Sequence, residues 1–298
     1  LEAADGKERL RECGVDQVIE SDATADEFVV ALRALVALAP SEPAIADEPD
    51  EQPSKSTLIA IGAPLGGCGA TEVAVAWATR LARFAPTVLI DVDETSPAIA
   101  QRLGLSLIPN LRSAIDVIQH RHGSLESCLQ DLGRLEVLPG LTGDRDWLEV
   151  RPLEVLDVVS ELRSRFRYVV ANIGSQLEQV GFGDSGRFAI SRAVLEQADR
   201  IVGVGLSNPV SISRLILWIG RVADLNQRGQ ISLLVNRAPR SSYKRAEVAQ
   251  ELGRVSGQDV TFLAHDREVE EAAWSGRVVS SGSFYRTINK LVDRSLVS

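Results

Sequence analysis

Apolar residues follow two alternating patterns along the chain after residue 56. Short aliphatic runs, typical of strands buried on both faces, predict strands at 57–61, 87–93, 167–172, 200–205 and 231–236. Between them, apolar residues at every third or fourth position predict amphipathic helices, among them 71–84, 211–222 and 267–275. Strands that alternate with helices predict an α/β fold with a doubly wound, mostly parallel sheet.

The part of the chain before residue 57 has a different composition. Residues 1–39 hold nine acids and four bases, and residues 40–56 hold five acids and one base, so together they carry the whole formal charge of −9. The second stretch is rich in proline and acid, as extended linkers are. We therefore expect a small N-terminal element at 1–39, a linker at 40–56 and a main domain at 57–298.

Length and composition limit the class of protein. With 298 residues and 45% hydrophobic content, the chain can bury one large core. No apolar run reaches the roughly 18 residues of a spanning helix, so we expect no integral membrane span. Cys13, Cys68 and Cys128 lack metal-binding spacing and favour a reducing compartment. These observations predict a cytoplasmic protein.

A glycine-rich segment joins the first predicted strand to the first predicted helix. Gly66, Gly67 and Gly69 lie in this connection, and Thr71 begins the helix. In a phosphate-binding loop, glycines let backbone N–H groups surround the phosphates, and a Ser/Thr hydroxyl holds Mg²⁺. The same pattern also fits a glycine-rich turn that binds nothing, and the residues alone leave both interpretations open.

Polar residues end two of the predicted strands. Asp91 and Asp93 close the strand 87–93, and Asn172 closes the strand 167–172. Doubly wound sheets bind ligands beyond the carboxyl ends of their strands. The alternative for the two carboxylates is a strand-end cap that makes structural hydrogen bonds.

These segments together resemble the MinD/ParA superfamily of P-loop ATPases, whose deviant loop reads K-G-G-x-G-K-T. On that pattern Leu65 takes the place of the first lysine, Ala70 the place of the second, and Thr71 the place of the magnesium ligand. The loop residues expected to hold a nucleotide are Gly66, Gly67, Cys68, Gly69, Ala70 and Thr71. The resemblance extends over nearly all of residues 57–298.

The resemblance also assigns roles outside the loop. Asp91 and Asp93 match the first switch, in which the second carboxylate helps to place the attacking water or the magnesium shell, so Asp93 is the catalytic candidate. Asn172 stands where the second switch carries an aspartate. Asn236 and Arg237 match an N-R-x-P element whose Asn amide reads the adenine base. For Asn236 the alternative is a turn that its side chain closes.

The departures from the family pattern remove charge. The chain has four lysines, Lys7, Lys55, Lys244 and Lys290, and none lies near the loop or a switch. Losing the loop lysine forfeits about 3 kcal/mol or more of transition-state stabilisation. We predict no meaningful turnover. Weak binding of ATP with Mg²⁺ stays open, because the backbone N–H groups and the helix N-terminus remain.

Within the superfamily the chain resembles the TadZ/CpaE-type branch, which includes septum-site-determining-like proteins. Residues 1–39 resemble the last part of its receiver-like domain, with an arm docked on the main domain as the alternative. The resemblance implies a localisation factor for Flp/Tad pilus or secretion machinery, or for septum placement. Such a protein is recruited to the pole or septum through contacts with pilus, secretion or division proteins. A homodimer could not use Leu65 in trans as the family uses lysine.

Two other functions compete with this one. The first is an active ATPase that an arginine of a partner completes. The second is a ParA-like partitioning protein that contacts DNA through the basic residues Arg237, Arg240, Lys244 and Arg245, although most such runs are solvated surfaces.

Overall fold

The computed structural model describes residues 56–143, 145–180, 186–257 and 260–297. These residues all belong to one unit of the chain, Ser54–Ser298. The predictions for residues 1–39, and for the linker 40–56 apart from Ser56, lie outside the described residues.

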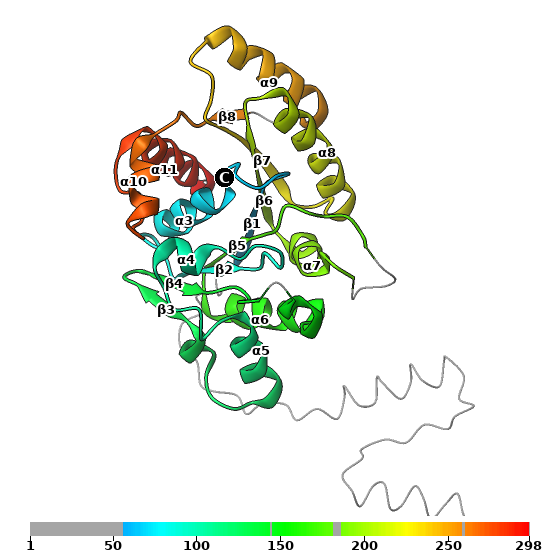
Figure 1. The fold of residues 1–298 in the computed structure, drawn as a ribbon, viewed down its shortest axis with the longest axis vertical. Helices are drawn as coiled ribbons and strands as arrows, with labels where there is room; N and C mark the ends of the chain where they lie inside the picture. The colour runs from blue at the N-terminus through cyan, green and yellow to red at the C-terminus, as the bar shows by residue number, and fades with distance from the viewer. Residues whose placement is uncertain (1–55, 144, 181–185, 258–259, 298) are drawn as a thin grey trace, which may run out of the picture. The chain divides into compact units, whose positions relative to one another are not determined.

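The described strands form one eight-stranded sheet (Figure 1). They are β1 (Thr57–Gly62), β2 (Thr87–Asp91), β3 (Gln130–Leu132), β4 (Leu135–Leu138), β5 (Tyr168–Asn172), β6 (Arg200–Leu206), β7 (Gln230–Asn236) and β8 (Val260–Phe262). Their order is β3-β4-β2-β5-β1-β6-β7-β8; β3 pairs antiparallel with β4, and every other pair is parallel. The predicted doubly wound, mostly parallel α/β sheet is confirmed.

Helices cover both faces of this sheet (Figure 1). They are α3 (Ala70–Leu81), α4 (Ile99–Leu103), α5 (Leu111–His120), α6 (Pro152–Arg165), α7 (Ala189–Gln197), α8 (Pro209–Leu225), α9 (Ser242–Ser256), α10 (Arg267–Trp274) and α11 (Gly282–Val297). Buried side chains of α3, α4, α10 and α11 form one core, and those of α5 to α9 form the other. None of the helices within the described ranges is long and apolar enough to cross a membrane.

The central strand β1 shows why the apolar runs predicted the sheet so well. Leu58 and Ala60 pack into one core, whereas Ile59 and Ile61 pack into the other. Successive side chains of a strand point to opposite faces, so a strand covered on both sides must be apolar throughout. The same physical constraint holds for the predicted strands on either side of it.

The order of the strands brings the candidate residues to one edge. β1 lies between β5 and β6, and the registers place Ile61 beside Asn172 and Asp91 beside Asn172. β2 ends at Asp91 rather than at the predicted residue 93, because the Asp93 N–H donates to the Asp91 side chain instead of continuing the ladder. The glycine-rich segment and both strand ends therefore meet at the carboxyl edge of the sheet.

Candidate functional site

The glycine-rich segment forms a loop over the end of β1. Gly67 and Gly69 have φ angles of 78° and 95°, in the left-handed region that glycine adopts without strain. Gly69 is the N-cap of α3, and no side chain caps this helix. A Cβ at Gly69 would lie 2.5 Å from the Asn236 Nδ2, so only glycine fits there. The first turn of α3 keeps N–H groups that an anion could use.

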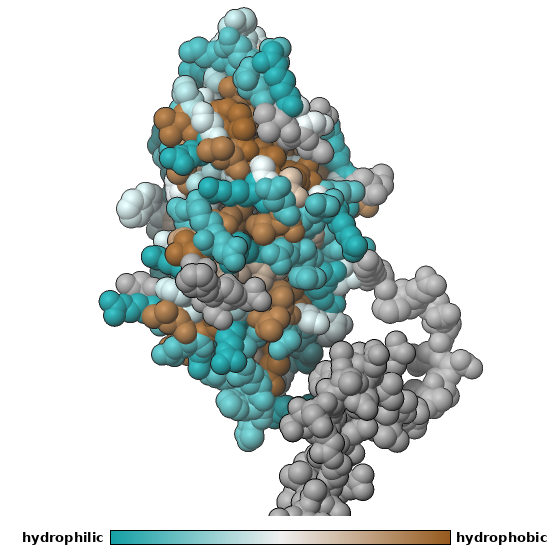
Figure 2. All heavy atoms as spheres, turned by 90° about the vertical axis from the view of Figure 1, so that its right-hand side faces the viewer, coloured by the Kyte–Doolittle hydropathy of each residue, from teal (hydrophilic) through white to brown (hydrophobic). Residues whose placement is uncertain are grey.

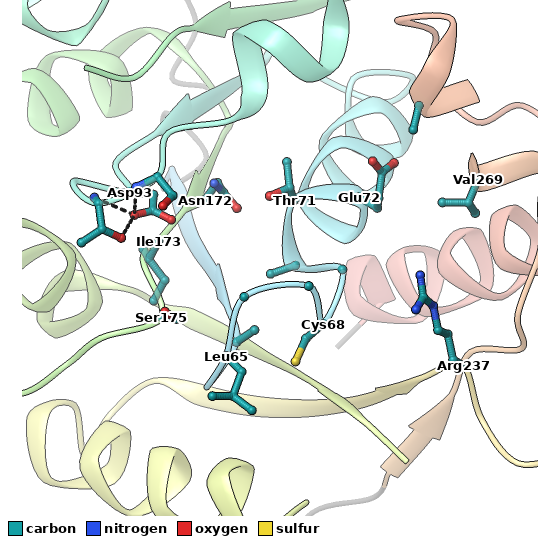
Figure 3. A pocket seen from close by; sticks show the side chains of 18 of the residues that line it. Leu65, Cys68, Thr71, Glu72, Asp93, Asn172, Ile173, Ser175, Arg237 and Val269 are labelled. Carbon is teal, nitrogen blue, oxygen red and sulfur yellow. Dashed lines mark hydrogen bonds between the residues drawn. The ribbon is translucent and has the colours of Figure 1, made fainter. Parts of the chain in front are cut away.

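A cavity of about 390 Å³ lies against this loop (Figure 3). The predicted nucleotide residues Gly66, Gly67, Cys68, Gly69, Ala70 and Thr71 all line it. Asp93, Asn172 and Arg237 line it as well, and α10 closes one side with Val269, Glu270 and Ala273. The fold therefore brings most of the predicted site residues around one cavity.

Asn172 and Thr71 face each other across the cavity (Figure 3). The Asn172 Nδ2 donates to the Asp91 Oδ1 over 3.0 Å, and both side chains are buried. An aspartate at position 172 would set two carboxylates at hydrogen-bond distance and would require a proton or a cation between them. Asn172 satisfies the Asp91 carboxylate without a metal ion.

Asp91 lies beneath the cavity. Its Oδ2 accepts hydrogen bonds from the backbone N–H groups of Ala98 at 2.8 Å and Ile99 at 3.0 Å, at the start of α4. Burial raises the pKa of this carboxyl to about 6, and the hydrogen bonds from Ile99, Asn172 and Ala98 oppose that rise. The geometry is that of a strand-end cap, the alternative left open for this residue.

Asp93 does line the cavity, and it also orders the loop that follows β2. Its Oδ1 accepts from the Thr95 N–H at 2.9 Å, the Thr95 hydroxyl at 2.7 Å and the Ser96 N–H at 3.0 Å (Figure 3). These bonds fix the carboxylate at the cavity wall. Asp93 and the Thr71 hydroxyl, the two predicted magnesium ligands, are among the oxygen groups that line the cavity.

Asn236 holds the loop rather than lining this cavity. Its Nδ2 donates to the Cys68 carbonyl at 3.0 Å, and its Oδ1 accepts from the Arg237 N–H at 2.8 Å. It lines the smaller space beside α10 instead. This is the turn-closing geometry left open for Asn236, and it places the amide between the loop and the end of β7.

Arg237 brings a positive charge to the cavity wall from outside the glycine-rich loop. Its side chain extends from the end of β7 beside the loop, between Cys68 and Val269 (Figure 3). Within the described part of the chain its guanidinium forms no hydrogen bond or ion pair. A strand 170 residues further along the chain therefore brings a positive charge to the cavity wall, although no lysine lies in the loop.

Glu72 is a site residue that sequence reasoning missed. It follows Thr71 in the first turn of α3 and lines the cavity. Both of its carboxylate oxygens accept from Arg102 of α4, through Nε and, at 2.8 Å, Nη2. Arg102 also donates to the Arg277 carbonyl at 3.0 Å. The signal was an acid directly after Thr71, the predicted magnesium ligand, and its partner lies thirty residues away.

The sequence matches no protein-family model and no curated protein. The structure nevertheless resembles solved ATPases with a TM-score of 0.66 in each of three cases. A ParA family ATPase from Chlorobium tepidum is 17% identical, and the match covers 80% of this chain and 98% of that one. The cell division ATPase MinD of Pyrococcus furiosus is 16% identical, and the match covers 82% of this chain and 100% of that one. The MinC:MinD complex of Aquifex aeolicus is 18% identical, and the match covers 82% of this chain and 97% of that one.

The chain has the MinD/ParA fold. At these identities the likeness establishes the fold, and the chemistry of the site rests on this chain's own residues. Solved proteins with the MinD/ParA fold include a Borrelia burgdorferi partition protein bound to AMPPNP and Pyrococcus horikoshii MinD complexed with Mg-ADP.

Both acidic and basic side chains surround this cavity in the described part of the chain. Among the described residues, the carboxylates of Asp93 and Glu270 and the guanidinium of Arg237 line it, together with Glu72, whose charge Arg102 compensates. The Leu65 side chain lies on the opposite side of the loop from Thr71 (Figure 3), and Ala70 contributes a methyl group where the MinD/ParA pattern has a lysine. Backbone N–H groups of the loop therefore border a cavity whose loop carries no lysine.

Proposed function

We propose that this protein is a pseudo-ATPase with the MinD/ParA fold that acts as a localisation and assembly factor through contacts with other proteins. The observation that carries the proposal is the cavity beside the loop. An ordered glycine loop borders this cavity, but the loop carries no lysine, and carboxylates line the cavity wall.

Phosphoryl transfer depends on cations at fixed places, and here the loop carries no lysine. A polyphosphate in the cavity would meet the carboxylates of Asp93 and Glu270, which line its wall. Removing the loop lysine costs about 3 kcal/mol or more of transition-state stabilisation, and Asn172 leaves the metal shell without its usual charge. We therefore infer that hydrolysis is lost.

Binding of Mg-ATP at the loop is part of the proposal only as a weak interaction. The N–H groups of the loop, the Thr71 hydroxyl, Asp93 and Arg237 are the groups that would support it. Their support is small, because no lysine lies in the loop and the Glu270 carboxylate lines the same cavity.

The cellular role rests on the resemblance and on the fold. Solved proteins with this fold include a septum-site-determining MinD, a MinC:MinD complex and plasmid partition proteins. The resemblance to the TadZ/CpaE-type branch suggests Flp/Tad pilus or secretion machinery as the assembly, and the pole or the septum as the location. A homodimer of this protein would form without a shared nucleotide.

One observation favours a second candidate, an active ATPase. Arg237 has an unpaired guanidinium at the cavity wall within the described residues, and a further arginine from a partner could complete the site. Arg237 enters from the end of β7 rather than from the loop, and it offers a planar fork where a lysine would offer a point charge. This candidate is therefore the weaker of the two.

A localisation experiment tests the main proposal. A fluorescent fusion of the full chain, expressed in its own cells, should form foci at the pole or septum, and Thr71→Ala should leave them unchanged. Thr79→Ala is the matched control, because it makes the same change on the same helix away from the cavity. Loss of the foci in Thr71→Ala but not in Thr79→Ala would show that localisation needs the nucleotide site.

A further inference from the structure

The outer face of α8 carries exposed apolar side chains. The inner face of this helix buries Ile212, Leu215, Trp218, Ile219 and Val222. On the opposite side Val210 is 65% exposed and Leu217 is 57% exposed. Figure 2 shows hydrophobic side chains interrupting the hydrophilic surface on the side of the molecule to which α8 belongs. Burying such side chains against a partner removes apolar surface from water, which favours association.

The apolar side chains lie on one stripe of the helix. Val210, Ser213, Leu217 and Gly220 follow each other at three- and four-residue steps, so they share a face. A Cβ at Gly220 would meet no atom within 4 Å, so nothing stands above that position. The stripe is about 15 Å long. Ser213 between Val210 and Leu217, and Gly220 beyond Leu217, let another helix approach closely and pack its ridge beside Leu217.

A notch of about 190 Å³ borders this stripe. It lies between Leu217 and the arginines Arg214 and Arg221 of α8, Leu65 of the loop, and the segment Ser175–Glu178. Arg221 forms an ion pair with Glu178 at 2.5 Å. Arg214 is exposed and has no hydrogen bond or ion pair with any described residue. The notch therefore offers one positive charge that no other described side chain neutralises.

The notch is continuous with the candidate site. Leu65 and Ser175 line both the notch and the cavity beside the loop. Leu65 faces outward from the loop, away from Thr71 (Figure 3). The residue that replaces a lysine of the MinD/ParA pattern thus adds an apolar side chain to the surface that α8 forms.

We propose that this surface binds an amphipathic helix of a partner protein whose apolar stripe is flanked by aspartate or glutamate. The apolar side chains of that helix cover Val210 and Leu217, and one carboxylate meets Arg214 at the notch. The inference rests on the proposed function, which requires contacts with other proteins, and it names the surface and the chemistry of the partner.

Charge complementarity selects this occupant over two others. A second copy that used the same face would bring the two copies of Arg214 into one interface, and like charges across an interface disfavour association. A nucleic acid would pair with Arg214 and leave Val210 and Leu217 exposed to water. An acidic amphipathic helix satisfies the charge and covers the apolar stripe at the same time.

Selection from a phage-displayed random peptide library against the full chain tests the inference. We expect the enriched peptides to carry apolar residues at helical spacing together with Asp or Glu. Their affinity should fall about tenfold or more in Leu217→Asp and in Arg214→Glu, because truncated or reversed central contacts carry most of the binding energy. Thermal melts of each variant check that the fold is intact.

Two matched variants control for general surface effects. Leu153 of α6 is 71% exposed and Arg254 of α9 has a side chain that is 62% exposed. Leu153→Asp and Arg254→Glu make the same chemical changes elsewhere and should alter peptide affinity less than about twofold.

Several results would overturn the inference. They are the absence of any enriched peptide, enriched peptides that are basic, and binding that Leu217→Asp and Arg214→Glu leave unchanged. A dimer in sedimentation that Leu217→Asp dissociates would assign the surface to a second copy instead. ATP turnover by the wild type would overturn the proposed pseudo-ATPase without affecting the peptide result, so the two failures are distinguishable.

Discussion

The ion pair between Glu72 and Arg102 should be one of the strongest local determinants of stability in the described part of the protein. It joins the first turn of α3 to α4, and the two side chains are 17% and 8% exposed. The Arg102 guanidinium also donates to the Ala272 carbonyl at 3.5 Å and to the Arg277 carbonyl at 3.0 Å. One side chain therefore connects α3, α4 and the segment that follows α10.

Arg102→Leu removes the guanidinium and leaves the Glu72 carboxylate partly buried without a partner. Breaking a buried pair from one side costs about 3–5 kcal/mol, because the remaining charge loses its compensation. Removing both charges with Glu72→Leu and Arg102→Leu together should recover most of that loss, since apolar side chains of similar size need no partner.

Urea unfolding followed by circular dichroism and tryptophan fluorescence gives the free energies of unfolding of Arg102→Leu, the double variant and the wild type. Arg254→Leu is the control, because its pair with Glu251 is exposed and should contribute less than about 1 kcal/mol. The reasoning is refuted if Arg102→Leu lies within about 1 kcal/mol of the wild type. It is equally refuted if the double variant is no more stable than Arg102→Leu.

Two further predictions concern the loop and the link between α10 and α11. Gly69→Ala places a Cβ 2.5 Å from the Asn236 Nδ2, at a backbone φ of 95°. It should therefore lower the free energy of unfolding by about 2–4 kcal/mol. In the control Gly66→Ala the new methyl group meets open space, so the free energy of unfolding should change by less than about 0.5 kcal/mol. The Asp266 carboxylate accepts hydrogen bonds from the Phe284 N–H at 2.9 Å and from the Ser283 hydroxyl at 3.0 Å. Burial raises the pKa of this carboxyl group, but the hydrogen bonds outweigh burial and hold the pKa below its usual value. A carboxyl group whose pKa is lowered by folding stabilises the fold at pH values above its unfolded-state pKa of about 4, and this stabilisation is lost as the pH falls through the folded-state pKa. Asp266→Ala should therefore lower the free energy of unfolding by about 1–3 kcal/mol at pH 7 and by less at pH 3. Urea unfolding at both pH values, with the exposed Asp157→Ala as control, checks this; an equal cost at both pH values would contradict it.

The sequence predicts the sheet well because its central strands are buried on both faces. Leu58, Ile59 and Ile61 are almost wholly inaccessible to solvent, so only apolar residues are tolerated there. The edge strand β3 was not predicted, because Gln130–Leu132 is short, half-exposed and partly polar. Edge strands need little apolar surface and leave a weak pattern in the sequence.

The candidate site was predictable where its residues lie next to each other in the chain. The loop glycines and Thr71 follow β1 directly, so the spacing alone predicted their place. The contacts that give the site its charge join distant segments: Asn172 to Asp91, Arg102 to Glu72, and Arg237 to the cavity. Such pairings follow from strand order and helix packing, and neither can be deduced from local sequence patterns.

The most direct test of the central claim is a single-turnover assay with γ-labelled ATP and Mg²⁺, with the full chain in excess over nucleotide. The account predicts no phosphate release above the buffer rate from the wild type, from Thr71→Ala or from the control Thr79→Ala. Release by the wild type and by Thr79→Ala that Thr71→Ala abolishes would contradict it, because hydrolysis would then depend on the hydroxyl at the start of α3.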